Sequence, residues 1–385
     1  MMAAPLGPIP QADPLPLPAP TLLLWGLLLL LFFLHLLAVN VMLGGSLIGA
    51  VARLRGRRKN RPHDRALAAW FGTAMPVLIA TAVTLGVAAL LFLQVLYGRL
   101  FFTSAVLVGW FWLAVIPVLI LAYGSAYRLA FGSRGSGTAA PHVLGWVVAG
   151  SLLAIAFIYV SNMSLLIRPD QFAPKYIGSE RGWHLNLADP TFVPRVLHLV
   201  LGAIAIAGLA VAHVGLARER LDAGFGRWAT RHGSLWFSVA TAVNLIAGIW
   251  WLAALPKETV LRFMGRSLEA ALALAGGVIL GLASLVLVAL AVQAKKPAGM
   301  IRGGSAALVL TLGLMLLTRD QVRTAALEAA GYTPAAWVAP QWGLMLIFAV
   351  LLVAALALTG GMLVALARGG AGARPTDGAG ATRPQ

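Results

Sequence analysis

Long apolar runs separated by short polar segments account for most of this chain of 385 residues. The first run begins at Thr21 and meets no charged residue before Arg53, a length greater than the roughly 20 residues that cross a bilayer. Eight further runs lie at 66–97, 101–129, 143–167, 192–217, 234–255, 267–294, 305–318 and 342–367. The pattern therefore predicts about nine transmembrane helices, of which 305–318 is the shortest.

Composition agrees with a membrane protein. Hydrophobic residues make up 60% of the chain and charged residues 11%, which leaves too little polar surface to cover a soluble domain. The formal net charge of +17 would suggest nucleic-acid binding in a soluble protein, but here the basic residues cluster between the apolar runs, where they act as topology signals. We therefore expect an all-α, polytopic membrane protein with no nucleic-acid partner.

The basic residues also predict the orientation. Of the 29 lysines and arginines, 19 fall in alternate segments that include 53–65, 218–231 and the C-terminal tail. The positive-inside rule places these segments in the cytoplasm. The N-terminus is then outside and the C-terminus cytoplasmic.

Two short matches indicate an internal duplication. The segment Ala80–Leu85 resembles Ala240–Leu245 at an offset of 160, and His35-Leu36 resembles His198-Leu199 at an offset of 163. They predict two duplicated four-helix bundles followed by one C-terminal helix. The expected organisation is a Pro-rich outer tail (1–20), a first bundle (21–168), an outer loop (169–191), a second bundle (192–318), an outer loop (319–341), a ninth helix (342–368) and a flexible cytoplasmic tail (369–385).

His198 and His35 are the residues in these helices that most favour a cofactor. A ligating side chain inside a membrane span is costly and marks a functional site by default, although a membrane histidine can also hydrogen-bond a neighbouring helix. The chain has no cysteine, which excludes disulfides, thiolate ligands and covalently attached c-type haem. Haem held by histidine in a helical core fits best. His213 lies near the cytoplasmic end of the same run as His198 and is more typical of an interface residue, so its role as a ligand stays open.

The whole layout resembles subunit I of the cytochrome bd quinol oxidases and their wider superfamily. The matching features are His35 in the first helix, FGTAMPVLIATAVTLG in the second, YVSN closing the fourth, RPDQF in the outer loop, PTFVPRVLHLV opening the fifth, and an R-x-M element opening the seventh. The resemblance implies a multi-pass protein of the bacterial inner membrane that binds one or more haem b groups, with quinone or quinol as a further ligand.

The resemblance also assigns roles to individual residues. It implies that His198 and Met264 are the axial ligands of a low-spin haem b, with Arg262 beside its propionates or the quinol. It implies that His35 binds the iron of a haem in the oxygen-reacting pair, and that Asn162 lines the outer side of that region.

Two departures from the family limit the expected activity. Family oxidases have glutamates in the third helix that bind haem and carry protons, whereas no Asp or Glu lies between Arg65 and Pro169 here. The quinol-binding outer loop is also reduced, to 256–266. We therefore expect an oxidoreductase subunit of a respiratory complex, with little oxygen reduction of its own. It would pass electrons between membrane quinol and a terminal acceptor or c-type cytochrome partner on the outer face, alongside other membrane subunits. The alternative is a haem-free scaffold or transporter-like bundle that anchors extrinsic subunits.

Overall fold

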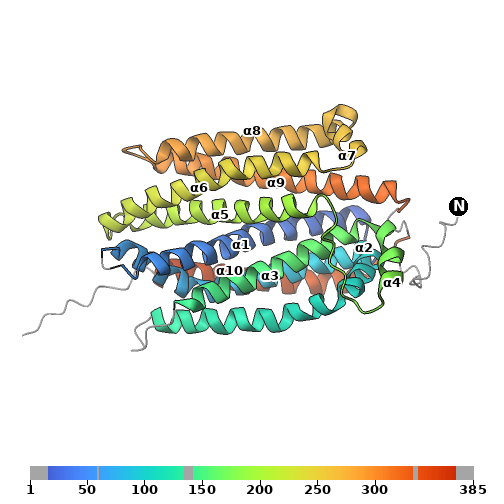
Figure 1. Cartoon of the computed structure of the whole chain (residues 1–385), viewed down its shortest axis with the longest axis horizontal. Coiled ribbons are helices and arrows are strands. Elements are labelled where there is room, and N and C mark those ends of the chain that lie inside the picture. Colours follow the sequence, from blue (N-terminus) through green and yellow to red (C-terminus); the bar gives the residue numbers. More distant parts are fainter. Residues whose placement is uncertain (1–15, 59, 134–141, 333–336, 370–385) are drawn as a thin grey trace, which may run out of the picture.

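Helices make up nearly all of the computed structural model, which describes residues 16–58, 60–133, 142–332 and 337–369 (Figure 1). Most of the two expected tails, 1–20 and 369–385, lies outside these residues. No β-strand occurs in the described ranges, where the single β-bridge joins Leu17 to Val338. Eight helices are long and apolar enough to cross a membrane. The all-α, polytopic fold class is therefore confirmed.

The long helices follow the predicted order. They are α1 (Thr21–Arg55), α2 (Pro62–Ser133), α3 (Val143–Leu166), α5 (Phe192–Arg218), α6 (Ala223–Ala253), α8 (Leu268–Ala291), α9 (Ala298–Ala329) and α10 (Trp342–Gly369). Short helical pieces connect them on one side: η1 (Pro169–Gln171), α4 (Phe172–Gly178), α7 (Lys257–Leu261) and the π-helical turn η2 (Arg262–Arg266).

Helix α2 contains two of the nine expected spans. It is 72 residues long, and Tyr97 interrupts it with non-helical φ and ψ angles of −130° and 27°. Both ends of α2 lie at the same side of the molecule in Figure 1, so the chain reverses at this break. The expected runs 66–97 and 101–129 thus cross the bundle in opposite directions, which accounts for nine crossings from eight helices among the described residues.

Two helices extend beyond the apolar runs that predicted them. Helix α6 begins at Ala223 instead of residue 234, with the Asp222 side chain capping it by accepting a hydrogen bond from the Phe225 N–H at 2.9 Å. Helix α9 continues past the expected end of the second bundle at residue 318 to Ala329. The first part of the expected outer loop 319–341 is therefore helical, because its charged residues find partners on other helices.

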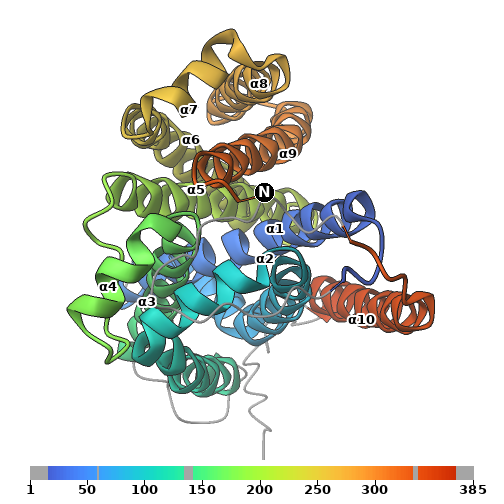
Figure 2. The same cartoon turned by 90° about the vertical axis from the view of Figure 1, so that its right-hand side faces the viewer.

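The two halves of the chain pack side by side through α1 and α5 (Figures 1 and 2). A side chain at Gly44 of α1 would place its Cβ 2.0 Å from the backbone oxygen of Ala203 in α5, so glycine permits this close approach. Helix α10 lies at the edge of the first half in Figure 2, where Phe348 packs edge-on against Phe92 of α2 with ring centroids 4.9 Å apart. It is an added helix, as the duplication predicts.

Candidate functional site

His35 is held by the second helix of the first half. Its Nδ1 lies 2.9 Å from the backbone oxygen of Ala82 in α2. The imidazole also packs on Gly86, where an added Cβ would be 2.7 Å from Cε1 of the ring. Because a carbonyl oxygen only accepts hydrogen bonds, Nδ1 carries the hydrogen and the lone pair of the neutral ring lies on Nε2. Metal-ligating histidines are commonly oriented by this type of hydrogen bond.

His198 has a similar position in the second half. Its imidazole lies beside the backbone of Asn244 in α6, and its Nδ1 is buried without a hydrogen-bond partner. The ring packs on Gly248, where an added Cβ would be 3.3 Å from both Cε1 and Nδ1. Both histidine side chains are half-buried.

These contacts show that the two halves are related in space as well as in sequence. In each half, the residue whose backbone lies beside the histidine precedes the supporting glycine by four residues, one helical turn. The pairs Ala82 and Asn244, and Gly86 and Gly248, are both separated by 162 positions. The sequence match Ala80–Leu85 with Ala240–Leu245 has an offset of 160, so the spatial equivalence differs from it by two residues.

The surroundings of His198 are more polar than those of His35. Four side chains at helical spacing on α6 have a buried polar atom without a hydrogen-bond partner: Ser234, Ser238, Thr241 and Asn244. The positions 162 residues earlier are all apolar: Gly72, Pro76, Ile79 and Ala82. Hydropathy alone does not reveal this stripe, although its spacing of four, three and three residues within an apolar run is a recognisable signal. The two histidine sites are therefore not equivalent.

A cluster of charged residues in the C-terminal part of α9 adjoins the His35 site. The Phe32 ring stacks on His35 with centroids 6.0 Å apart. The guanidinium of Arg319 lies 4.5 Å from the centroid of the same Phe32 ring. Arg323 lies 4.5 Å from the centroid of Tyr97, at the break in α2. The sequence placed these arginines in a loop, and only the extended α9 brings them beside the site.

Asp320 is the carboxylate of this cluster. It accepts a hydrogen bond of 2.9 Å from Nε1 of Trp25 in α1 and forms an ion pair with Arg323. Both Asp320 and Arg323 are buried, with 7% and 6% of their surface exposed. A buried charge is tolerated only when it is paired and hydrogen-bonded, so this network fixes the start of α1 relative to the C-terminal part of α9.

Arg195 extends the cluster toward His198, which follows it by one helical turn. Its Nε is buried without a partner, while its Nη2 donates to Oγ1 of Thr191 at 3.0 Å. Arg319 lies within electrostatic range of Arg195, Arg323 and Asp320. Asp189, the carboxylate that acts electrostatically on Arg195, pairs with Arg168 at 3.6 Å. The region between the histidines is therefore positively charged and suited to an anionic group.

Asn162 is buried inside the bundle, and its expected role on the outer side of the haem region stays a prediction. It lies in α3, is fully buried, and neither the oxygen nor the nitrogen of its amide has a hydrogen-bond partner. Neighbouring Ser161 accepts a hydrogen bond of 2.8 Å from the backbone N–H of Asn186 in the outer loop. An unpaired buried amide is costly, so this side chain is available for a ligand.

Met264 and Arg262 lie in the turn η2, and the structure does not bring them to the histidines. The Met264 side chain is 61% exposed, and the backbone at this residue is non-helical. Arg262 forms an ion pair with Glu328 near the end of α9. In the described part of the chain, neither residue forms a hydrogen bond or ion pair with His198. Their assignment as an axial ligand and a propionate partner stays a prediction.

His213 is oriented differently from the other two helical histidines. Its Nε2 lies 2.7 Å from Oγ of Ser305 in α9, so it joins two helices by a hydrogen bond. The described residues contain no group of three or more His, Asp or Glu side chains placed to bind a metal ion.

Comparison with known proteins supports the fold. No protein-family model and no curated protein matches the sequence. Among solved structures, a chain of the bd oxidase from Geobacillus thermodenitrificans superposes with a TM-score of 0.68 at 15% sequence identity. The match covers 92% of this chain and 99% of that chain. The protein is thus a multi-pass helical membrane protein with a bd-oxidase-like fold.

Proposed function

We propose that this chain is a haem-b-binding membrane subunit of a respiratory electron-transfer complex, with His198 and His35 as iron ligands. The observation that carries the proposal is the repeated placement of the two imidazoles, each beside the backbone of a residue on the next long helix and packed on the glycine four residues later. A histidine with a purely structural role would need only a partner for its own polar atoms, and would not need to recur at the equivalent place in both halves. At His35 the hydrogen bond from Nδ1 leaves Nε2 as the ligating atom.

The residues present fit a macrocycle with acidic side groups. The fold supplies apolar walls, two imidazoles, the guanidinium of Arg195, whose buried Nε has no partner, and the buried guanidinium of Arg319. Charge-assisted hydrogen bonds from arginine to carboxylate are strong and geometrically specific. These arginines would hold the propionate groups of haem. The bound haem would supply one-electron transfer at its iron.

The protein residues orient the ligands and exclude water. The Ala82 carbonyl fixes the tautomer of His35 by accepting the Nδ1 hydrogen, and Gly86 sets the position of its ring. Asn162 would line the outer side of this region with an amide that is free to donate and accept. Electrons would pass between membrane quinol and a c-type cytochrome partner on the outer face. This c-type haem would belong to another chain, because no cysteine is present here.

Oxygen reduction by the isolated chain is not part of the proposal. The segment 66–168 has no carboxylate, so α2 beyond its first turn and all of α3 offer no acidic group to carry protons into the core. Quinol-dependent oxygen uptake by the purified chain should therefore be close to background. Uptake at the rate of a complete quinol oxidase would contradict this expectation.

The function is tested by optical spectroscopy of the dithionite-reduced protein. The wild-type chain should show a b-type band, and His198→Ala should lose it wholly or in part. His213→Ala is the matched control, because it removes an imidazole from the same helix that is engaged with Ser305. A wild-type spectrum without a b-type band, or a band unaffected by His198→Ala, would refute the proposal and favour a haem-free scaffold.

A further inference from the structure

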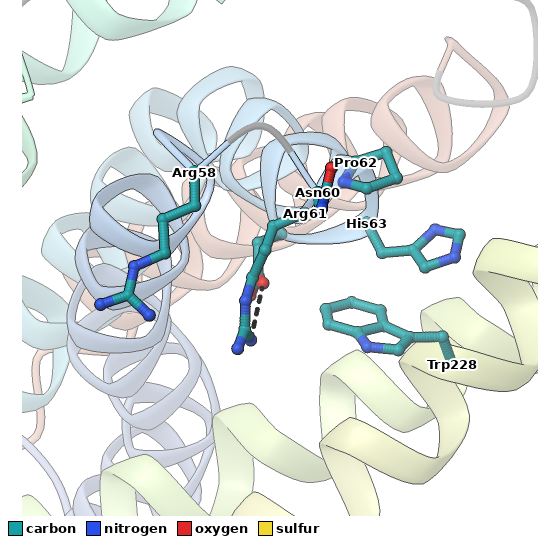
Figure 3. Close-up of a pocket in the computed structure, with 7 residues that line it drawn as sticks. Arg58, Asn60, Arg61, Pro62, His63 and Trp228 are labelled. Atoms are coloured by element: carbon teal, nitrogen blue, oxygen red, sulfur yellow. Dashed lines mark ion pairs between the residues drawn. The ribbon is translucent and has the colours of Figure 1, made fainter.

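A cavity of about 530 Å³ opens at the other end of the bundle from the histidine sites, where α1 turns into α2 beside the start of α6. Its lining is Arg58, Asn60, Arg61, Pro62, His63, Asp64 and Trp228 (Figure 3). Ligand sites in proteins commonly have volumes of roughly 300–1,000 Å³, so the cavity is large enough for a headgroup-sized molecule. Nothing in the proposed electron-transfer function uses it.

Two arginines give the cavity its chemical character. Arg61 lies 3.5 Å from Oδ2 of Asp64, a long ion pair in which 47% of the arginine side chain stays exposed. Arg58 is exposed, and no ion pair of Arg58 is found in the described part of the chain. Both guanidinium groups therefore retain free N–H donors, and Figure 3 shows them extending from the same turn.

The opposite wall is aromatic. His63 of α2 lies against Trp228 of α6, with ring centroids 5.4 Å apart (Figure 3). Trp228 also stacks on His232 at 4.5 Å, which fixes the position of its indole. Tryptophan is enriched at the level of lipid headgroups because its ring is apolar and its N–H is polar. The wall thus matches the interface between headgroup and acyl chain.

The charge of the lining selects the ligand class. Arg58 and Arg61 contribute two positive charges and Asp64 one negative charge, so these three side chains give the lining a single net positive charge. A phosphodiester carries one negative charge and would neutralise it. A nucleotide or a phosphate monoester carries more negative charge and would leave an excess.

The location of the cavity favours a lipid headgroup as the source of the phosphodiester. The cavity lies between the last residues of α1 and the first residues of α2 and α6, which places it at the end of three membrane-crossing helices. This side has the excess of lysine and arginine that the positive-inside rule assigns to the cytoplasm. Basic pockets between membrane helices on that side bind lipid headgroups.

We propose that this cavity binds the phosphodiester headgroup of an anionic phospholipid of the phosphatidylglycerol type. Arg58 and Arg61 hold the phosphate, Asp64 orients Arg61 through their ion pair, and Trp228 borders the glycerol backbone of the lipid. None of these residues is a proposed haem ligand, so lipid binding here can be tested separately from the proposed function.

The test measures lipid binding by native mass spectrometry of the delipidated full-length chain, titrated with phosphatidylglycerol or phosphatidylcholine. Each basic residue near anionic lipid contributes roughly 1 kcal/mol, so Arg58→Gln and Arg61→Gln should each weaken the tightest phosphatidylglycerol site by about fivefold. Arg57→Gln is the matched control, because Arg57 is exposed in the same turn but does not line the cavity. Phosphatidylcholine, which has no net charge, should bind more weakly than phosphatidylglycerol.

Three results would overturn the proposal. The first is an equal loss of binding in Arg57→Gln and Arg58→Gln, which would indicate diffuse surface charge instead of a built site. The second is unchanged binding in both Arg58→Gln and Arg61→Gln. The third is displacement of the lipid by an equal concentration of soluble glycerophosphoglycerol, which would identify a free phosphodiester as the ligand.

Discussion

Replacement of Gly86 by alanine tests the geometry of the His35 site directly. The new Cβ would lie 2.7 Å from Cε1 and 2.8 Å from Nδ1 of His35. Carbon atoms in ordinary contact are about 3.5–4.0 Å apart, so the imidazole must move by roughly 0.8 Å or more. The Gly248 position differs, because an added Cβ would be 3.3 Å from His198 and a shift of only a few tenths of an ångström restores normal contact.

The cost of this displacement can be worked out term by term. The Nδ1 to Ala82 oxygen distance is 2.9 Å, and a shift of this size takes it beyond the normal range of a hydrogen bond. Loss of that bond costs about 1 kcal/mol, and overpacking adds about 1–3 kcal/mol. Alanine favours helix over glycine by about 1 kcal/mol. The net destabilisation of Gly86→Ala is therefore about 1–3 kcal/mol.

The assay compares three variants by their reduced optical spectra and by thermal unfolding in detergent. Bonds to a metal tolerate about 0.2 Å of error, so Gly86→Ala should lose or alter part of the b-type band. Gly248→Ala should have a weaker effect. Gly124→Ala, in the same helix as Gly86 and with no atom within 4 Å of the added Cβ, should leave both spectrum and stability unaffected or slightly improved. The reasoning is refuted if Gly86→Ala behaves like Gly124→Ala.

Two further predictions concern packing and pH. Gly44→Ala would place Cβ against the backbone oxygen of Ala203, which cannot rotate away. Thermal unfolding should therefore show that the free energy of unfolding falls by about 3 kcal/mol or more. A change below about 1 kcal/mol would contradict the α1–α5 packing. In the outer loop, the hydrogen bonds from Arg168 lower the pKa of Asp170. A lowered carboxyl pKa contributes stability that is present above the unfolded pKa and disappears as pH falls through the folded pKa. Arg168→Gln should therefore raise the pKa of Asp170 in a carboxyl NMR titration and move the loss of loop order to higher pH. Because the Asp170 side chain is 53% exposed, the stability effect should stay below about 1 kcal/mol, and an unchanged pKa would refute the pairing.

The hydropathy pattern of the sequence was enough to predict the fold class of this protein and the order of its membrane-crossing helices. A membrane-crossing helix must satisfy its own backbone hydrogen bonds and present apolar side chains to lipid, so its signal lies within one stretch of about 20 residues. The all-α fold, the order of the spans and the added last helix follow from this local signal. The correspondence between His35 and His198 was also visible, because a histidine in an apolar run is conspicuous and the duplication repeats it at an offset of 163, close to the 160 of the other match.

Only the tertiary structure decided how the charged C-terminal part of α9 is used. The sequence Arg319-Asp320-Gln321-Val322-Arg323 is too polar for a span and predicts a loop. The helix continues because the charges are satisfied by residues far away in the chain: Trp25 donates to Asp320 across 295 positions, and the rings of Phe32 and Tyr97 lie beneath the two arginines. Hydropathy sums neighbouring residues, whereas the energy of a buried charge depends on its partners in space. The same reason explains the cavity beside Trp228, which exists only because α6 passes the turn between α1 and α2.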